Sequence, residues 1–113
     1  MIIAIDFDGV LVEDKFPTIG EPKYEMVNAV NDLIQSGGHE VILWTCRVGD
    51  RLREAEDWCR EHRMRFTTVN GNSPNNLAEY RTDPRKVYAD VYIDDRGIGY
   101  SEELAVSFIK KLL

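Results

Sequence analysis

Ile2-Ile3-Ala4-Ile5-Asp6-Phe7-Asp8-Gly9-Val10 begins as an apolar run and ends in two carboxylates and a glycine. Four consecutive apolar residues, three of them isoleucine, predict a strand buried on both faces, which is typical of the centre of a parallel sheet. Asp6 and Asp8 then lie at the carboxyl end of that strand, where open α/β sheets bind ligands. Two carboxylates at i and i+2 point to the same side and repel each other unless a proton or a cation such as Mg²⁺ lies between them. The alternative is a charged turn in which Gly9 only permits the bend.

The composition is that of an ordinary globular chain. Its 113 residues suit one domain, 1–113, with 43% hydrophobic residues and a formal net charge of −6. No apolar run is long enough to cross a membrane, and Met1 leads into the first strand without the features of a secretion signal, so we expect a cytoplasmic protein with no membrane partner. The acidic charge does not favour nucleic acid as a partner, although it does not exclude it. Cys46 and Cys59 lack metal-binding spacing and suit a reducing compartment.

Apolar periodicity predicts that helices and strands alternate after the first strand. Helical spacing follows Glu21-Pro22 and ends at Gly37-Gly38, and a buried strand comes next at 41–44. Strand, helix and strand in this order imply parallel pairing through a crossover. The same signals predict, in chain order, a helix from Gly49-Asp50, a short strand at 66–69, a loop at 70–76 with a helical turn at 77–80, a strand at 87–93, and a helix from Ser101 that buries Leu104 and Phe108. The fold class is therefore α/β with a central parallel sheet.

Polar side chains follow three of the predicted strands. Asp6 and Asp8 follow the first, Thr45 and Arg47 the second, and Asp94 and Asp95 the last. Because the carboxyl ends of neighbouring parallel strands lie about 4.8 Å apart, these groups should converge on one site that could hold a metal and a phosphate.

These residues resemble the motifs of the haloacid-dehalogenase-like hydrolases, which are mostly Mg²⁺-dependent phosphatases with a Rossmann-like core. Residues 2–10 match motif I, 41–45 match motif II, which is an apolar strand ending in Thr or Ser, and 91–95 match motif IV, which is an apolar strand ending in two Asp. Motif III, a lysine before the last strand, is matched by Lys86, with Arg85 beside it as the alternative. The resemblance covers nearly the whole chain and implies a Rossmann-like three-layer sandwich around the parallel sheet.

The resemblance implies catalytic and phosphate-binding roles. Asp6 would attack the phosphorus atom and become an aspartyl phosphate, and Asp8 would protonate the leaving oxygen and then deprotonate the hydrolytic water. Thr45 would hydrogen-bond the phosphoryl oxygens, and Lys86 would neutralise them. To these the sequence adds Arg47, whose guanidinium suits either phosphate binding or a structural ion pair.

The resemblance also implies a Mg²⁺ site. The ion would be held by the Asp6 carboxylate, the backbone carbonyl of Asp8 and Asp94, with Asp95 orienting the ligand shell or a bound water. A set made only of oxygen ligands suits Mg²⁺.

Larger family members cover the site with an inserted cap domain. The intervals 11–21 and 70–85 are too short for such an insertion, so we expect no cap. An open site would then be closed by a bulky phosphorylated substrate, of a class that the sequence does not specify, or by a second copy in a homo-oligomer.

Two other classes of function stay open. Response-regulator receiver domains share the small α/β scaffold and hold a phosphoryl group on aspartate, but their acidic pair comes first, whereas here Asp94-Asp95 comes last. A binding protein without catalytic activity is the other alternative. The presence of every expected aspartate disfavours it.

Overall fold

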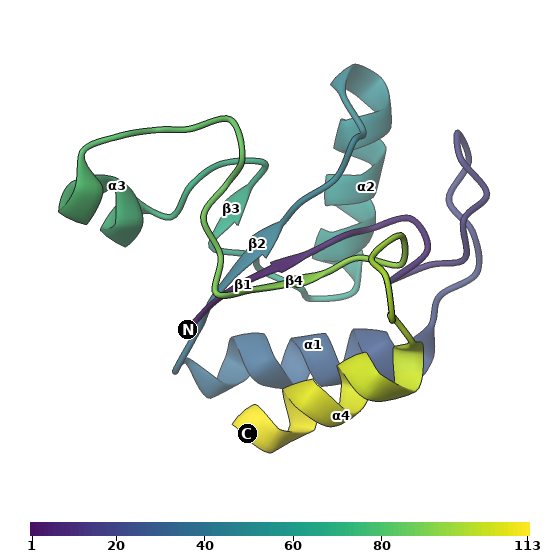
Figure 1. The fold of residues 1–113 in the computed structure, drawn as a ribbon. Coiled ribbons are helices and arrows are strands. Elements are labelled where there is room, and N and C mark those ends of the chain that lie inside the picture. Colours follow the sequence, from purple (N-terminus) through teal and green to yellow (C-terminus); the bar gives the residue numbers. More distant parts are fainter.

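The computed structural model describes residues 1–113 and is built around a four-stranded sheet (Figure 1). All strands run parallel, in the order β3-β2-β1-β4. In chain order the elements are β1 (Ile2–Ile5), α1 (Tyr24–Ser36), β2 (Glu40–Leu43), α2 (Gly49–Glu61), β3 (Thr68–Val69), α3 (Pro74–Tyr80), β4 (Val91–Ile93) and α4 (Glu102–Leu112). The predicted α/β class with a central parallel sheet is confirmed, and no cap domain interrupts these elements.

The apolar run of β1 lies between β2 and β4, in the middle of the sheet. Its side chains alternate between the two faces, as a strand requires. Ile3 and Ile5 join the main hydrophobic core with residues of α1, α2 and α4, whereas Ala4 belongs to a smaller cluster on the opposite face. All three are at most 1% exposed. Burial on both faces explains why this stretch shows no alternation of polar and apolar residues.

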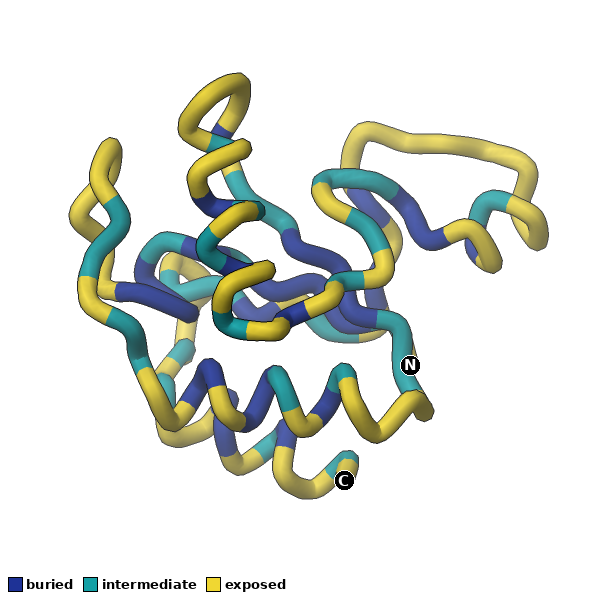
Figure 2. Tube along the Cα trace, turned by 180° about the vertical axis from the view of Figure 1, so that it is seen from behind, coloured by how far each residue is buried: buried dark blue, intermediate teal, exposed yellow.

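Three helices cover one face of the sheet. Figure 2 shows the buried side of α1 turned toward the strands, and Figure 1 shows α4 lying beside α1 beneath them. The predicted apolar stripe of α1 is buried, with Met26, Val30 and Leu33 at its centre. Gly37 ends this helix in the left-handed conformation, and Ser101 caps α4 by accepting a hydrogen bond from the amide of Leu104. None of the helices combines the length and the apolar character needed to cross a bilayer.

The opposite face of the sheet has a thinner cover. Ala4 and Ile42 pack there against Val87 and Ala89 of the segment that leads into β4, with Trp44 alongside. The helix α3 has seven residues and lies farther out, at the left of Figure 1. The third layer of the sandwich is therefore mostly irregular chain.

The last strand is shorter than its apolar pattern indicates. It comprises Val91–Ile93 instead of 87–93. The Tyr92 hydroxyl donates to the carbonyl of Val87 over 2.6 Å and accepts from the amide of Ala89 over 3.2 Å. A side chain therefore satisfies polar backbone groups that strand pairing would otherwise have to satisfy.

Two further details also correct the sequence prediction. The helix α3 begins at Pro74, inside the predicted loop, because Ser73 caps its amino end and proline suits the first turn. Leu104 is 62% exposed, because the inward face of α4 is formed by Ala105, Val106 and Ile109 and leaves Leu104 at its margin.

Candidate functional site

The strand order places the carboxyl ends of β2, β1 and β4 side by side. Pairing continues one residue past the strands, since the amide of Asp6 donates to a β4 carbonyl over 3.0 Å and the amide of Trp44 to a β1 carbonyl over 2.9 Å. The residues that follow each strand, including Asp6, Thr45 and Asp94, are therefore brought to one edge of the sheet, as their positions in the sequence predict.

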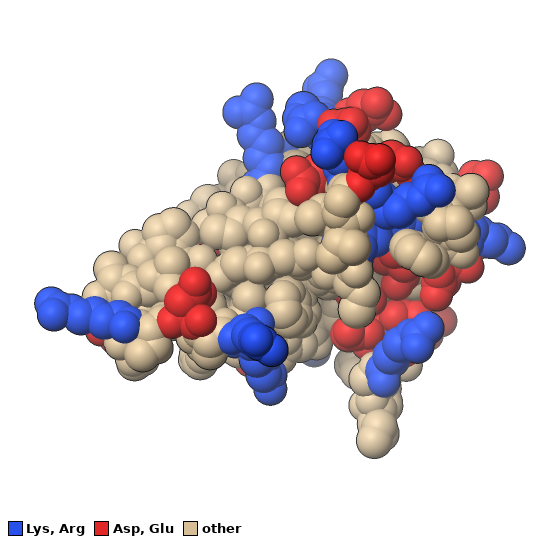
Figure 3. Space-filling view, turned by 90° about the horizontal axis from the view of Figure 1, so that it is seen from above, with Lys and Arg blue, Asp and Glu red and all other residues tan.

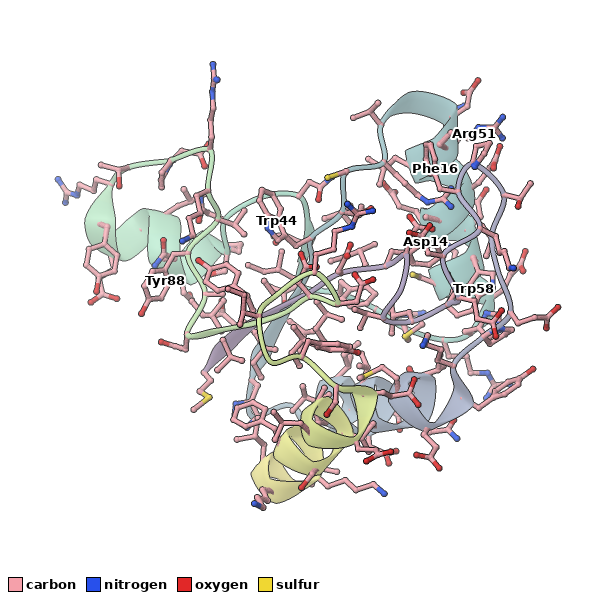
Figure 4. All side chains as sticks on the ribbon, turned by 45° about the vertical axis from the view of Figure 1, so that its right-hand side comes forward. Asp14, Phe16, Trp44, Arg51, Trp58 and Tyr88 are labelled. Carbon is pink, nitrogen blue, oxygen red and sulfur yellow. The ribbon has the colours of Figure 1, made fainter.

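A cavity of about 500 Å³ opens at this edge, a volume within the usual range for small-molecule sites. Figure 4 shows Asp14 and Phe16 on the loop that follows β1, near α2, and Trp44 on the side of the site nearer Tyr88. The cavity is lined by Asp6, Asp8, Asp14, Phe16, Trp44, Thr45, Cys46, Arg47, Asp94 and Arg96.

Three carboxylates form an acidic cluster at the cavity. Asp6, Asp94 and Asp95 each present a carboxylate oxygen, and these oxygens lie within 4.8 Å of one another. Asp6 accepts one hydrogen bond, from the amide of Phe7 over 2.8 Å, and Asp94 accepts one from the amide of Arg96 over 2.9 Å. One oxygen of Asp95 is buried without any partner.

The acidic cluster fits a divalent cation. Carboxylate oxygens are the ligands that Mg²⁺ prefers, and the unpartnered buried oxygen of Asp95 lacks the hydrogen bond that a structural carboxylate normally has. Asp95 also packs against Gly9, where an added Cβ would lie 2.2 Å from its Oδ2, so the glycine of motif I makes room for the second acid of motif IV. The side chain of Asp8 is not part of the cluster.

Burial and mutual repulsion perturb these acids. Burial, together with the charges of Asp94, Asp95 and Asp8, raises the pKa of Asp6 from 3.8 to about 7, although the hydrogen bond from Phe7 opposes this rise. Burial and the charge of Asp94 likewise raise the pKa of Asp95. Without a cation, Asp6 is therefore only partly ionised at neutral pH.

The charged side chains are unevenly distributed over the surface. Figure 3 shows acidic side chains gathered toward the end of the molecule where the strands end, at the right of the view, with basic side chains among them. The neighbouring surface in the middle of the view is mostly uncharged. Charged side chains of both signs therefore gather at the end of the molecule where the strands end.

Asp8 and Arg47 form a buried ion pair. The Arg47 Nε and Nη2 atoms each donate to a different oxygen of Asp8, both over 2.8 Å. The Arg47 side chain is 1% exposed and that of Asp8 15%. Of the two possibilities that the sequence left open for Arg47, the structure thus shows the structural ion pair.

Thr45 follows the last residue of β2 by two positions and lies in the cavity wall. Its hydroxyl accepts a hydrogen bond from the amide of Arg47 over 3.2 Å, and its own amide donates to Asn70 over 2.8 Å. These bonds leave the hydroxyl proton of Thr45 available to a ligand.

The basic residues before β4 do not line the cavity. The Lys86 ammonium lies 5.1 Å from the centroid of the Tyr92 ring, and neither Lys86 nor Arg85 forms an ion pair. Arg96 does line the cavity; its side chain is 84% exposed and lies 4.0 Å from Asp14. Lys86 is therefore not among the residues that line the cavity.

The sequence reasoning missed five residues of the cavity wall: Asp14, Phe16, Trp44, Cys46 and Arg96. Arg96 directly follows the acidic pair and Trp44 directly precedes Thr45, so adjacency to a motif was an available signal for both. Asp14 and Phe16 belong to an irregular loop, for which periodicity gives no signal.

Comparison with known proteins gives one informative match. No family model matches the chain, and no curated protein does. Among solved structures, a conserved protein from Bacteroides thetaiotaomicron is similar, with 36% sequence identity and a TM-score of 0.81 over all of this chain and 92% of that one. At this identity and coverage, the chain belongs to the same family as that conserved protein.

Proposed function

We propose that this chain, as a member of the family of that conserved protein, is a Mg²⁺-dependent phosphatase of the haloacid-dehalogenase-like type. It would hydrolyse a phosphomonoester through an aspartyl phosphate formed on Asp6. The observation that carries this proposal is the acidic cluster of Asp6, Asp94 and Asp95, whose oxygens lie within 4.8 Å of one another. Two of its members, Asp6 and Asp94, line the same cavity as Thr45.

The acidic cluster would hold the cation. Asp6, Asp94 and Asp95 supply carboxylate oxygens, and the backbone carbonyl of Asp8 is a further candidate ligand by resemblance. A bound Mg²⁺ would supply positive charge against these carboxylates and against the phosphate. A cation would also favour the ionised form of Asp6, whose pKa of about 7 otherwise leaves much of it protonated at neutral pH.

In the first step, an oxygen of Asp6 attacks the phosphorus atom and the ester P–O bond breaks. The leaving oxygen takes a proton from Asp8, which has to be in its carboxylic acid form for this step and regains the proton in the second; its side chain is 15% exposed and lines the same cavity. The product is an alcohol and a phosphoryl group bound to Asp6.

In the second step, a water molecule attacks the phosphorus atom while Asp8 takes one of its protons. The bond between the Asp6 oxygen and phosphorus breaks, which releases inorganic phosphate and restores the Asp6 carboxylate. The Thr45 hydroxyl would donate to a phosphoryl oxygen in both steps. Arg96, the exposed cation of the cavity wall, is better placed than Lys86 to neutralise the phosphate.

The test measures turnover and covalent labelling together. Wild type, Asp6→Asn and Asp8→Asn are supplied with Mg²⁺ and an aryl phosphate whose phosphorus is labelled. We expect wild type to hydrolyse the ester without retaining label. Asp6→Asn should neither hydrolyse the ester nor retain label, and Asp8→Asn should retain label on Asp6. The reason is that a good leaving group needs little acid, whereas the hydrolytic water still needs a base.

Two results would contradict this proposal. A long-lived aspartyl phosphate in wild type would favour a receiver-like signalling domain. Label retained by Asp6→Asn would show that another residue is the nucleophile.

A further inference from the structure

Arg47 is the most deeply buried charged side chain of the protein, although it lies beside an open cavity. Its guanidinium has five N–H groups, and five acceptors surround it. Two are the oxygens of Asp8. The others are the carbonyls of Pro17, Thr18 and Arg51, at 3.2, 3.0 and 3.4 Å. No N–H group is left for a phosphate, so the surroundings of this arginine favour a structural role over phosphate binding.

Two aromatic rings complete the surroundings of the guanidinium. The Arg47 Cζ atom lies 5.3 Å from the centroid of Phe7 and 5.1 Å from that of Phe16, within the range of cation–π attraction. The hydrogen bond and charge of Asp8 raise the pKa of Arg47 further. A planar group bound on all edges and flanked by rings has little freedom to move.

The paired bonds define the position of Asp8. One hydrogen bond would let a carboxylate rotate, whereas two parallel bonds from the fork of an arginine fix its plane and its distance. A lysine ammonium could supply charge here but not this geometry. The exposed part of the Asp8 carboxylate therefore faces the cavity in a fixed orientation.

The same guanidinium also anchors the loop that forms one wall of the cavity. Pro17 and Thr18 belong to the segment between β1 and α1 that carries Asp14 and Phe16, and their carbonyls have the Arg47 side chain as partner. One residue thus connects the Asp8 carboxylate, the cavity wall and, through the Arg51 carbonyl, the first turn of α2.

We infer that Arg47 is a positioning residue that fixes Asp8 for proton transfer and anchors the loop of residues 13–20 beside it. This inference rests on the proposed function for its catalytic part, since the N–H groups of Arg47 are all bound by acceptors of the protein itself. Its effect on the reaction is exerted through Asp8. A displacement of about 1 Å in a catalytic group lowers a rate by ~10²-fold. Losing the two paired hydrogen bonds from Arg47 to Asp8 should therefore lower the rate even where a positive charge remains.

The kinetic test uses Arg47→Lys, with Arg60→Lys as the matched control, because Arg60 is an exposed arginine of α2 that pairs with Asp57. We expect Arg47→Lys to lower kcat by ~10- to 100-fold with KM and inhibition by inorganic phosphate changed less than ~3-fold. In the Asp8→Asn background, the same substitution should change kcat less than ~2-fold. If Arg47→Lys does not fold, Arg47→Gln, which keeps one amide donor toward Asp8, replaces it.

Three outcomes would overturn the inference. Weaker inhibition by inorganic phosphate with unchanged kcat would make Arg47 a phosphate ligand. An equal loss of kcat in the Asp8→Asn background would make its role independent of Asp8. A kcat of Arg47→Lys equal to that of wild type would show that Arg47 has no role in the reaction.

A structural readout separates this inference from the proposed function. Trypsin cleavage after the exposed Lys15 reports whether the loop is anchored, and it needs no substrate. Cleavage there should be at least ~10-fold faster in Arg47→Lys than in wild type or Arg60→Lys, and equal rates would refute the anchoring. If wild type hydrolyses no phosphate ester, the proposed function fails, while the proteolysis result still decides whether Arg47 holds the loop.

Discussion

Replacing Asp6 by asparagine should stabilise the protein without metal and destabilise it relative to wild type with metal. The reason is the raised pKa of Asp6, about 7 in the folded chain against 3.8 for an ordinary aspartate. In the unfolded chain Asp6 ionises near pH 4, whereas in the folded chain it keeps its proton until about pH 7. The free energy of unfolding therefore falls as the pH rises between these values, and above about pH 7 it falls no further on account of Asp6.

The magnitude follows from the difference of about 3 between the two pKa values. A pKa difference of 1 corresponds to about 1.36 kcal/mol, so full ionisation of Asp6 would destabilise the fold by about 4 kcal/mol. Asp6 is only partly buried, and solvent screening reduces this to about 2 kcal/mol. For a domain of this size, that corresponds to a melting temperature about 8 °C higher for Asp6→Asn at pH 8 in EDTA.

The assay is thermal unfolding at pH 8 and at pH 4, with EDTA or with excess Mg²⁺. In EDTA the advantage of Asp6→Asn should disappear toward pH 4, where wild-type Asp6 is protonated too. With Mg²⁺ at about 100 times its dissociation constant, wild type should gain about 2.7 kcal/mol, and the order of the two proteins should reverse. Asp32→Asn, on the exposed side of α1, is the matched control and should not change either result. Equal stability of wild type and Asp6→Asn in EDTA at pH 8 would refute the reasoning.

Further predictions concern the metal, the phosphate and the motif I glycine. Exhaustive chelation should abolish phosphate-ester turnover and readdition of Mg²⁺ should restore it; turnover that survives chelation would contradict a metal-dependent site. Arg96→Ala should raise KM by ~5- to 30-fold through the loss of one charged contact, whereas Arg53→Ala, another exposed arginine paired with an aspartate, should not; a steady-state assay decides between them. Gly9→Ala should lose more than about 1 kcal/mol of stability, because Gly9 has φ +89° and its Cβ would overlap Asp95, whereas Gly38→Ala has nothing within 4 Å and should melt near wild type. Similar melting temperatures for the two glycine variants would show that Asp95 can move aside.

Much of the site could be predicted from the sequence because the site residues closely follow, in the sequence, the strands that position them. An apolar run that ends in Asp6 predicts both a central strand and a carboxylate at its end, and the same holds for Asp94 after β4. Once the strands are known to be parallel and adjacent, the convergence of Asp6, Thr45 and Asp94 follows from the geometry of the sheet.

The remaining features depend on contacts between distant parts of the chain. Asp8 and Arg47 are 39 positions apart, and only the fold shows that the arginine uses all of its donors inside the protein. The position of Lys86 depends on the path of an irregular segment whose backbone is satisfied by the Tyr92 hydroxyl. No periodicity in the sequence signals a hydrogen bond between a side chain and a distant carbonyl.

The aspartates of this protein differ in how fully their carboxylate oxygens are bound, and this separates Asp8 and Asp90 from the acidic cluster. Asp8 has both oxygens bound by Arg47, and Asp90 accepts from the amide of Ile2 and the hydroxyl of Tyr88. Each of these acids has partners, and the hydrogen bonds lower the pKa of Asp90.

Asp6 and Asp95 show the opposite pattern. Their pKa values are raised by burial and by neighbouring acids, and one Asp95 oxygen has no partner at all. Three carboxylates so close together destabilise a fold unless positive charge joins them, yet the chain directs its nearest buried cation, Arg47, to Asp8 instead. The one buried cation of the fold is therefore directed away from the acidic cluster, which supports the proposal that a metal ion supplies positive charge there.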